Sequence, residues 1–185
     1  IGYLARIAPE KGLHHLVEAV IKLKSRPGAE EARLHIAGWL SPENQAYADE
    51  QWGRLDSCGL QEAYQYEGTV DREAKLEFFR NIDILSVPTA FQEPKGLYAL
   101  EAMAAGIPVV LPSHGAFPEL LEASGGGLLF EPGNVAELAQ SFAELLDDDE
   151  RRLVLGGSGQ QFVHRHRNAS VMAKSTSKII REFLV

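Results

Sequence analysis

The sequence predicts an α/β protein built on a doubly wound parallel sheet. Short β-branched apolar runs alternate with segments whose apolar residues recur at helical spacing, and this alternation continues along the chain. The 185 residues, 45% of them hydrophobic, are enough for one domain with a sizeable core. Together these observations predict a Rossmann-like unit with helices on both faces of the sheet.

The predicted elements follow one another in a regular order. Asp71 and Asn134 are the expected N-caps of two helices, and Glu137 is the expected capping-box partner of Asn134. Two more helices are expected in the tail. We expect strands near 1–6, 33–38, 64–66, 82–87, 107–111 and 127–130, with helices near 12–24, 43–57, 71–80, 97–105, 117–122 and from 134 onward.

Charge and cysteine usage narrow the class of function. A net charge of −8 argues against nucleic acid as a partner, because binding to a phosphate backbone needs a dense basic face. The single cysteine, Cys58, excludes an intrachain disulfide, so a cytoplasmic location is the default. No apolar run approaches the length of a membrane span.

The charge is divided unevenly along the chain. Residues 1–150 carry a net charge of −14, whereas residues 151–185 carry +6. We expect 1–150 to form the sheet domain and 151–185 to add helices that pack on it, with their basic face against the acidic body. The alternative is peripheral contact of the basic tail with an inner membrane surface or an anionic lipid-linked acceptor.

A loop and helix after the expected strand at 82–87 carry two carboxylates. Glu93 lies in the loop and Glu101 about one turn into the helix, with seven residues between them. In open α/β sheets ligands bind beyond the carboxyl ends of the strands, where a helix amino terminus also offers free N–H groups to an anion. Ionised carboxylates accept hydrogen bonds from vicinal hydroxyls, so the pattern suits a sugar nucleotide.

Two cations follow the first expected strand. Arg6 and Lys11 are five residues apart in the segment R-I-A-P-E-K-G. Taken alone, such residues are most often solvated surface. At the same sheet edge as Glu93 and Glu101, they can reach one phosphate pair and stabilise the charge that develops on a diphosphate leaving group.

These segments resemble a known enzyme family. The spacing of the two glutamates within E-P-K-G-L-Y-A-L-E-A-M-A-A-G-I-P-V-V resembles the E-x7-E signature of group 1 retaining, nucleotide-sugar-dependent glycosyltransferases of GT-B fold. The first segment resembles that family's R-x4-K-G. The resemblance covers nearly the whole chain and implies the C-terminal, donor-binding half of such an enzyme. Because the first residues already read as a strand, we expect the N-terminal acceptor domain to be absent.

The resemblance also implies roles for individual residues. The residue matching Glu101 binds ribose hydroxyls, and the residue matching Glu93 binds a hydroxyl of the transferred sugar. Arg6 and Lys11 match the cations that hold the diphosphate. We therefore expect Glu93, Arg6 and Lys11 to be catalytic. The expected donor-binding positions are Gly38, Val70, Lys95, Gly96, Leu97, Tyr98 and Glu101.

Three of these positions can be compared with the family pattern. Lys95 stands where the family usually has Phe. Gly38 matches a turn that usually contains two glycines. Val70 belongs to the segment 68–70, whose family counterpart reads the nucleobase through its backbone. His114, in the loop after the strand near 107–111, is expected to be an exposed loop histidine, and the alternative is that it reaches the donor.

The implied reaction is transfer with retention of configuration, in which the protein mainly positions groups and stabilises charge. We expect a UDP-, GDP- or ADP-sugar as donor substrate, a sugar or lipid-linked glycan as acceptor, and no tightly bound cofactor. The run 147–149 matches D-x-D but ends a helix, so we expect no metal site. The isolated chain is not expected to turn over. The alternatives are a nucleotide-binding or interaction module without transferase activity, and a GT-B epimerase or phosphorylase.

Overall fold

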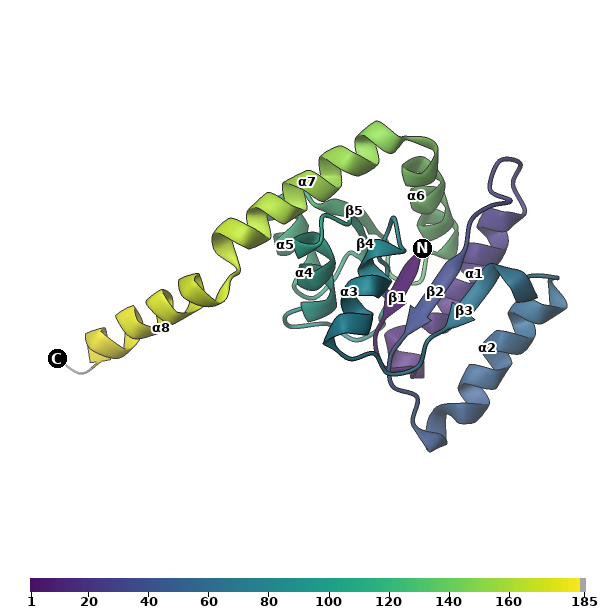
Figure 1. Cartoon of the computed structure of the whole chain (residues 1–185), viewed down its shortest axis with the longest axis horizontal. Helices are drawn as coiled ribbons and strands as arrows, with labels where there is room; N and C mark the ends of the chain where they lie inside the picture. Colours follow the sequence, from purple (N-terminus) through teal and green to yellow (C-terminus); the bar gives the residue numbers. More distant parts are fainter. Residues whose placement is uncertain (184–185) are drawn as a thin grey trace.

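The computed structural model describes residues 1–183 and has the α/β architecture that the sequence predicts (Figure 1). Strands and helices alternate from β1 to α6, except that the segment around Leu85 stands in place of a strand between α3 and α4, and two further helices follow. The strands are β1 (Gly2–Leu4), β2 (Leu34–Ala37), β3 (Tyr64–Tyr66), β4 (Val109–Pro112) and β5 (Gly127–Phe130). The helices are α1 (Leu13–Lys24), α2 (Gln45–Ser57), α3 (Arg72–Arg80), α4 (Leu97–Ala104), α5 (Phe117–Ser124), α6 (Val135–Asp147), α7 (Asp149–His166) and α8 (Ala169–Phe183).

The strands pair in parallel. β1 pairs with β2, β2 with β3, and β4 with β5. The segment around Leu85 joins the two groups, because Leu85 forms parallel bridges to both Gly2 and Val109. The order across the sheet is therefore β3-β2-β1, the Leu85 segment, then β4-β5. All the carboxyl ends lie at one edge.

The strand predicted at 82–87 is shorter in the structure. Its ladder consists of hydrogen bonds on either side of Leu85, such as Ser86 N to Gly2 O at 2.9 Å and Leu85 N to Pro108 O at 3.1 Å. The chain then turns, since Thr89 N donates to Val87 O at 2.8 Å. Pro88, which has no N–H, lies inside this turn. The loop that carries Glu93 thus begins where pairing stops.

Alternate side chains of the strands enter two separate cores. In β4, Val110 packs into the core beneath α1, α2 and α6, while Val109 and Leu111 pack into the core beneath α3, α4 and α5. The sheet is therefore covered on both faces. This arrangement leaves its carboxyl edge as the place where loops from several strands meet.

Both predicted helix caps are present. The carboxylate of Asp71 accepts from Ala74 N at 2.9 Å, and Asn134 Oδ1 accepts from Glu137 N at 3.1 Å. In a capping box the Glu137 carboxylate would accept from the backbone N–H of Asn134. In this structure it accepts instead from Glu131 N, at 2.8 Å. The backbone N–H of Asn134 is already donated to Glu131 O.

The two tail helices differ in their packing. α7 crosses α4 and α5, where Val163 is buried and the Gln160 amide donates to Ala104 O at 3.2 Å. Asp148, inside the D-x-D run, caps α7 by accepting from Arg151 N. α8 extends away from the body and contributes no buried side chain (Figure 1). Within residues 1–183, no helix is both long and apolar enough to cross a membrane.

Candidate functional site

Loops from three strands converge at the carboxyl edge of the sheet. The centre of this site is an ion pair between Lys11, in a 3₁₀ turn after β1, and Glu93, in the loop before α4. Their side chains are only 15% and 12% exposed. The ammonium of Lys11 also lies 5.6 Å from the centroid of the Phe91 ring, a cation–π distance.

Backbone and hydroxyl contacts hold these two loops together. Thr89 is buried, and its hydroxyl donates to Glu10 O at 2.8 Å. Ala90 N donates to the same carbonyl at 3.0 Å. The Lys11 turn and the Glu93 loop are therefore tied to each other independently of the ion pair.

The loop after β4 supports Glu93 from the other side. Ala116 N donates to Glu93 O at 2.9 Å. Gly115 has φ of 60°, and a Cβ atom there would lie 2.7 Å from Glu93 O, so only glycine fits this approach. This contact could not be predicted from the sequence, because α4 and β4 separate the two segments.

His114 is half-buried, not an exposed loop histidine as expected. Its Nε2 lies 2.9 Å from Thr89 O, and a carbonyl can only accept, so the proton belongs on Nε2. Its Nδ1 is buried without a hydrogen-bond partner among the described residues. The ring helps to fix the start of the Glu93 loop.

The predicted segment 95–98 opens α4. Gly96 has φ of 58°, and a Cβ atom there would lie 2.5 Å from the Phe117 ring. The N–H groups of Leu97 and Tyr98 are in the first helical turn, where no intrahelical acceptor exists. The side chains of Lys95 and Leu97 are exposed. The backbone of this turn can thus bind an anion.

Tyr98 is an unexpected feature of this turn. Its hydroxyl is buried without a partner among residues 1–183. Burial, reinforced by the nearby Glu93 carboxylate, raises the pKa of Tyr98 well above its usual value. The group is therefore a neutral hydrogen-bond donor next to the central ion pair.

Glu101 lies one turn further along α4 and is also paired. Lys75, from the second turn of α3, donates to Glu101 Oε1 at 2.6 Å. This pair is more open, with side chains 31% and 42% exposed. The spacing of residues predicted α3 but not its position relative to α4, so Lys75 was not expected at this site.

Arg6 does not join the central pair. Its guanidinium is 3.2 Å from Glu10, and its side chain is 57% exposed. The main chain is nevertheless anchored, because the buried Tyr3 hydroxyl donates to Arg6 O at 3.0 Å. Arg6 is thus a solvent-facing cation on a fixed backbone at the same edge.

Gly38 and Val70 lie on the loops after β2 and β3. Gly38 N donates to Gly68 O at 2.8 Å, and the Tyr66 hydroxyl donates to Gly38 O at 2.8 Å. Val70 is half-buried against the core beneath α3 and α4. Both positions are at the edge where the other predicted residues lie.

His14, at the start of α1, is a further residue that sequence reasoning missed. The Tyr47 hydroxyl accepts from His14 N at 3.0 Å and lies 2.8 Å from His14 Nδ1, to which it can donate. Burial, helped by His15 and Arg54, lowers the pKa of His14. The lowered pKa therefore favours the neutral form of the ring.

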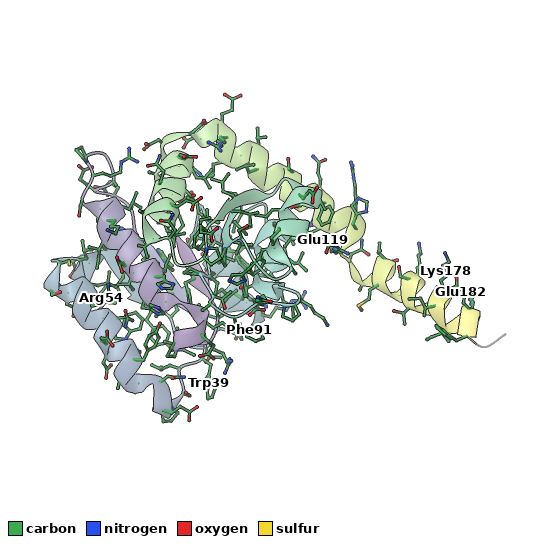
Figure 2. All side chains as sticks on the ribbon, turned by 180° about the vertical axis from the view of Figure 1, so that it is seen from behind. Trp39, Arg54, Phe91, Glu119, Lys178 and Glu182 are labelled. Carbon is green, nitrogen blue, oxygen red and sulfur yellow. The ribbon has the colours of Figure 1, made fainter. Side chains whose placement is uncertain are left out.

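Exposed apolar side chains border the site. Trp39, Phe91 and Leu97 are all more than half exposed. Figure 2 labels Trp39 and Phe91 in the lower part of the body, the end toward which β1 and β2 run in Figure 1. The edge thus combines backbone N–H donors, two lysines, two carboxylates and an apolar rim, a set of groups suited to a ligand with phosphate and hydroxyl groups.

Comparison with known proteins decides the family. Residues 1–162 match the family described as glycosyl transferases group 1. The chain belongs to this family. The E-x7-E resemblance seen in the sequence is therefore confirmed at the level of the family.

Individual relatives agree with this assignment. A D-inositol 3-phosphate glycosyltransferase of Corynebacterium efficiens is 32% identical over 177 residues, which is 95% of this chain and 40% of the relative. The C-terminal domain of a group 1 family glycosyl transferase from Francisella tularensis, LpcC, superposes with a TM-score of 0.82 at 25% identity, covering 91% of this chain and 85% of that one.

A third similarity concerns the fold alone. HepE of Anabaena, solved in complex with UDP, has a TM-score of 0.88 at 23% identity, covering 98% of this chain and 48% of that chain. This group 1 chain thus has the fold of GT-B C-terminal domains and spans 40% of the length of its Corynebacterium relative.

Proposed function

We propose that this domain binds the donor of a retaining glycosyltransferase, which moves a hexose-type sugar from a nucleoside-diphosphate sugar to an acceptor hydroxyl. The observation that carries the proposal is the convergence of the Lys11–Glu93 pair and the first turn of α4 at one sheet edge. A diphosphate and a sugar hydroxyl need this combination of cation, N–H groups and carboxylate.

Eight of the ten predicted site residues have a direct role in this proposal. Lys11 and Arg6 bind the diphosphate, which also accepts from the N–H groups of Leu97 and Tyr98. Glu93 accepts from a hydroxyl of the transferred sugar, and Glu101 accepts from the ribose. Gly38 and Val70 provide backbone contacts to the nucleotide.

The resemblance to retaining group 1 enzymes implies the proposed chemical step, and these contacts support it. As the bond to the anomeric carbon breaks, negative charge develops on the β-phosphate, and fixed cations and helix N–H groups stabilise that charge more than they stabilise the ground state. The departing phosphate takes the acceptor proton on the same face of the sugar, which retains configuration. The donor is a UDP-, GDP- or ADP-sugar, with no tightly bound cofactor. A donor that carries UDP agrees with the UDP complex of HepE.

The domain organisation completes the proposal. Residues 1–150 form the donor-binding unit, and 151–185 supply its C-terminal helices. The acceptor, a sugar or lipid-linked glycan, binds on a separate N-terminal domain, in agreement with the 40% coverage of the Corynebacterium relative and with the isolated C-terminal domain of LpcC. We place the enzyme in the cytoplasm, where the basic and apolar faces of α8 allow peripheral membrane contact.

The test compares this chain with a parent protein that contains an N-terminal domain. Release of nucleoside diphosphate is measured with the matched donor and acceptor, and the anomeric configuration of the product is read by NMR. We expect donor binding in both proteins and acceptor-dependent turnover with retention only in the parent, because the cleft between domains aligns the acceptor. Efficient turnover by the 185 residues alone, or an inverted product, would contradict the proposal.

A further inference from the structure

The Lys75–Glu101 contact joins two successive helices across the segment that carries Leu85 and Glu93. Lys75 is in α3 and Glu101 in α4, and the ammonium donates to Glu101 Oε1 at 2.6 Å. Phe78 of α3 and Met103 of α4 are buried in the same hydrophobic core. Both helices that carry the charged groups are therefore anchored in one core.

The stability of the fold does not explain this pair. Both side chains are about a third exposed or more, and ion pairs at such positions contribute little to the free energy of folding. A second pair on α3, Arg80 with Glu77 at 3.0 Å, is more exposed still and lies within one helix. The Lys75 contact differs from it because it acts on a carboxylate of the candidate site.

The geometry leaves Glu101 able to bind a diol. A carboxylate offers about four lone-pair positions on two oxygens, and the lysine occupies one position on Oε1. Oε2 and the rest of Oε1 stay available to two vicinal hydroxyls. The lysine also limits rotation of a side chain that would otherwise be free in solvent.

We infer that Lys75 is a positioning residue, which holds the Glu101 carboxylate in the orientation that accepts both ribose hydroxyls of the donor. This inference rests on the proposed function. Lys75 acts through Glu101 and adds selectivity for nucleotides that carry a 2′,3′-diol. Replacing Lys75 should therefore weaken the binding of nucleotides that carry the diol and leave the thermal stability of the chain nearly unchanged.

The test uses calorimetric titration and thermal unfolding of the chain. The probe is whichever of UDP, GDP and ADP binds with the lowest Kd, together with its 2′,3′-dideoxy analogue. For Lys75→Met we expect roughly fivefold weaker binding of the ribonucleotide, the scale of one impaired charge-assisted contact, and unchanged binding of the dideoxy analogue. Lys75→Arg should restore binding to within about twofold, since it keeps the charge. Arg80→Met, the matched control on α3, should change neither ligand.

A double variant separates a positioning role from direct contact. If Lys75 acts through Glu101, adding Lys75→Met to Glu101→Gln should cause no further loss of ribonucleotide affinity. Equal losses for the ribonucleotide and its dideoxy analogue, or additive losses in the double variant, would overturn the inference and leave the proposed function intact. Failure of all three nucleotides to bind the unaltered chain would instead overturn the proposed function, and the inference with it.

Discussion

Two lysine–glutamate pairs lie at the carboxyl edge of the sheet, and they differ in burial and support. Lys11 and Glu93 are nearly buried, and the loops on either side of Glu93 are held by backbone hydrogen bonds. Lys75 and Glu101 stand on neighbouring helices and are partly open to water. The Lys11–Glu93 pair therefore helps to hold its loops in place. The Lys75–Glu101 pair lies on the surface of two helices whose packing does not depend on it.

This difference decides what each substitution can report. Removing one partner of a buried pair leaves an uncompensated charge, so stability and ligand binding change together. Removing one partner of an exposed pair costs little stability, so a change in affinity can be attributed to the ligand contact. Substitutions in the Lys75–Glu101 pair therefore report on ligand binding with little change in stability. Substitutions in the Lys11–Glu93 pair report mainly on how the site is held together.

The largest expected effect is on the buried pair. Glu93→Ala should lower the free energy of unfolding by about 2–3 kcal/mol, because the Lys11 ammonium is left poorly solvated. Urea denaturation measures this loss. The double variant Lys11→Met/Glu93→Ala serves as the control and should recover part of the stability. A Glu93→Ala protein as stable as the unaltered chain would show that the pair is solvated.

The next effect separates the two cations after β1. Arg6→Ala and Lys11→Ala should each weaken nucleoside-diphosphate binding by about 1–3 kcal/mol, the value expected for one lost charge-assisted contact. Only Lys11→Ala should also lower the unfolding midpoint, since Arg6 is mostly exposed. Calorimetry measures the nucleoside-diphosphate affinity, and thermal unfolding measures the midpoint. Unchanged affinity in both variants would remove these cations from the site.

Glu101→Gln should have a smaller effect, confined to the ribose. We expect ribonucleotide binding to weaken by about 1 kcal/mol and the dideoxy analogue to be unaffected, because only the former offers the hydroxyls. The free energy of unfolding should change by less than about 0.5 kcal/mol, as for other exposed pairs. Competition titrations with the two nucleotides measure the difference, and equal losses would show that Glu101 does not contact the diol.

The smallest effect concerns pH. Burial lowers the pKa of His14, so the unfolded chain binds more protons than the folded chain below the ordinary histidine pKa. The contribution of His14 is therefore present above that value and is lost as pH falls through the folded pKa. Stability should decline as pH falls below about 6.5, the ordinary histidine pKa, and less steeply in His14→Gln. Urea midpoints above and below this pH test it. Identical slopes would assign the decline to other groups.

The sequence predicted the alternation of elements, the caps at Asp71 and Asn134, and the edge at which Glu93 and Glu101 lie. These features depend on local spacing and on the rule that ligands bind at the carboxyl ends of parallel strands. The contact of Lys75 with Glu101 and that of Gly115 with the Glu93 backbone could not be predicted. Each depends on how separate elements pack against one another. The spacing of Arg6 and Lys11 likewise predicted that both lie at the same edge of the sheet. It did not predict that the Arg6 side chain is exposed while that of Lys11 is nearly buried.

The most direct test of donor binding is calorimetric titration of the chain with UDP-, GDP- and ADP-sugars and with the corresponding bare nucleotides. We expect saturable binding of at least one sugar nucleotide, tighter than that of its bare nucleotide, because Glu93 adds a contact to the sugar. In Glu93→Gln, shown to be folded by its unfolding curve, this preference should disappear while the bare nucleotide still binds. If no sugar nucleotide binds saturably, or if the unaltered chain binds the sugar nucleotide and the bare nucleotide with equal affinity, this edge of the sheet is not a donor-sugar site.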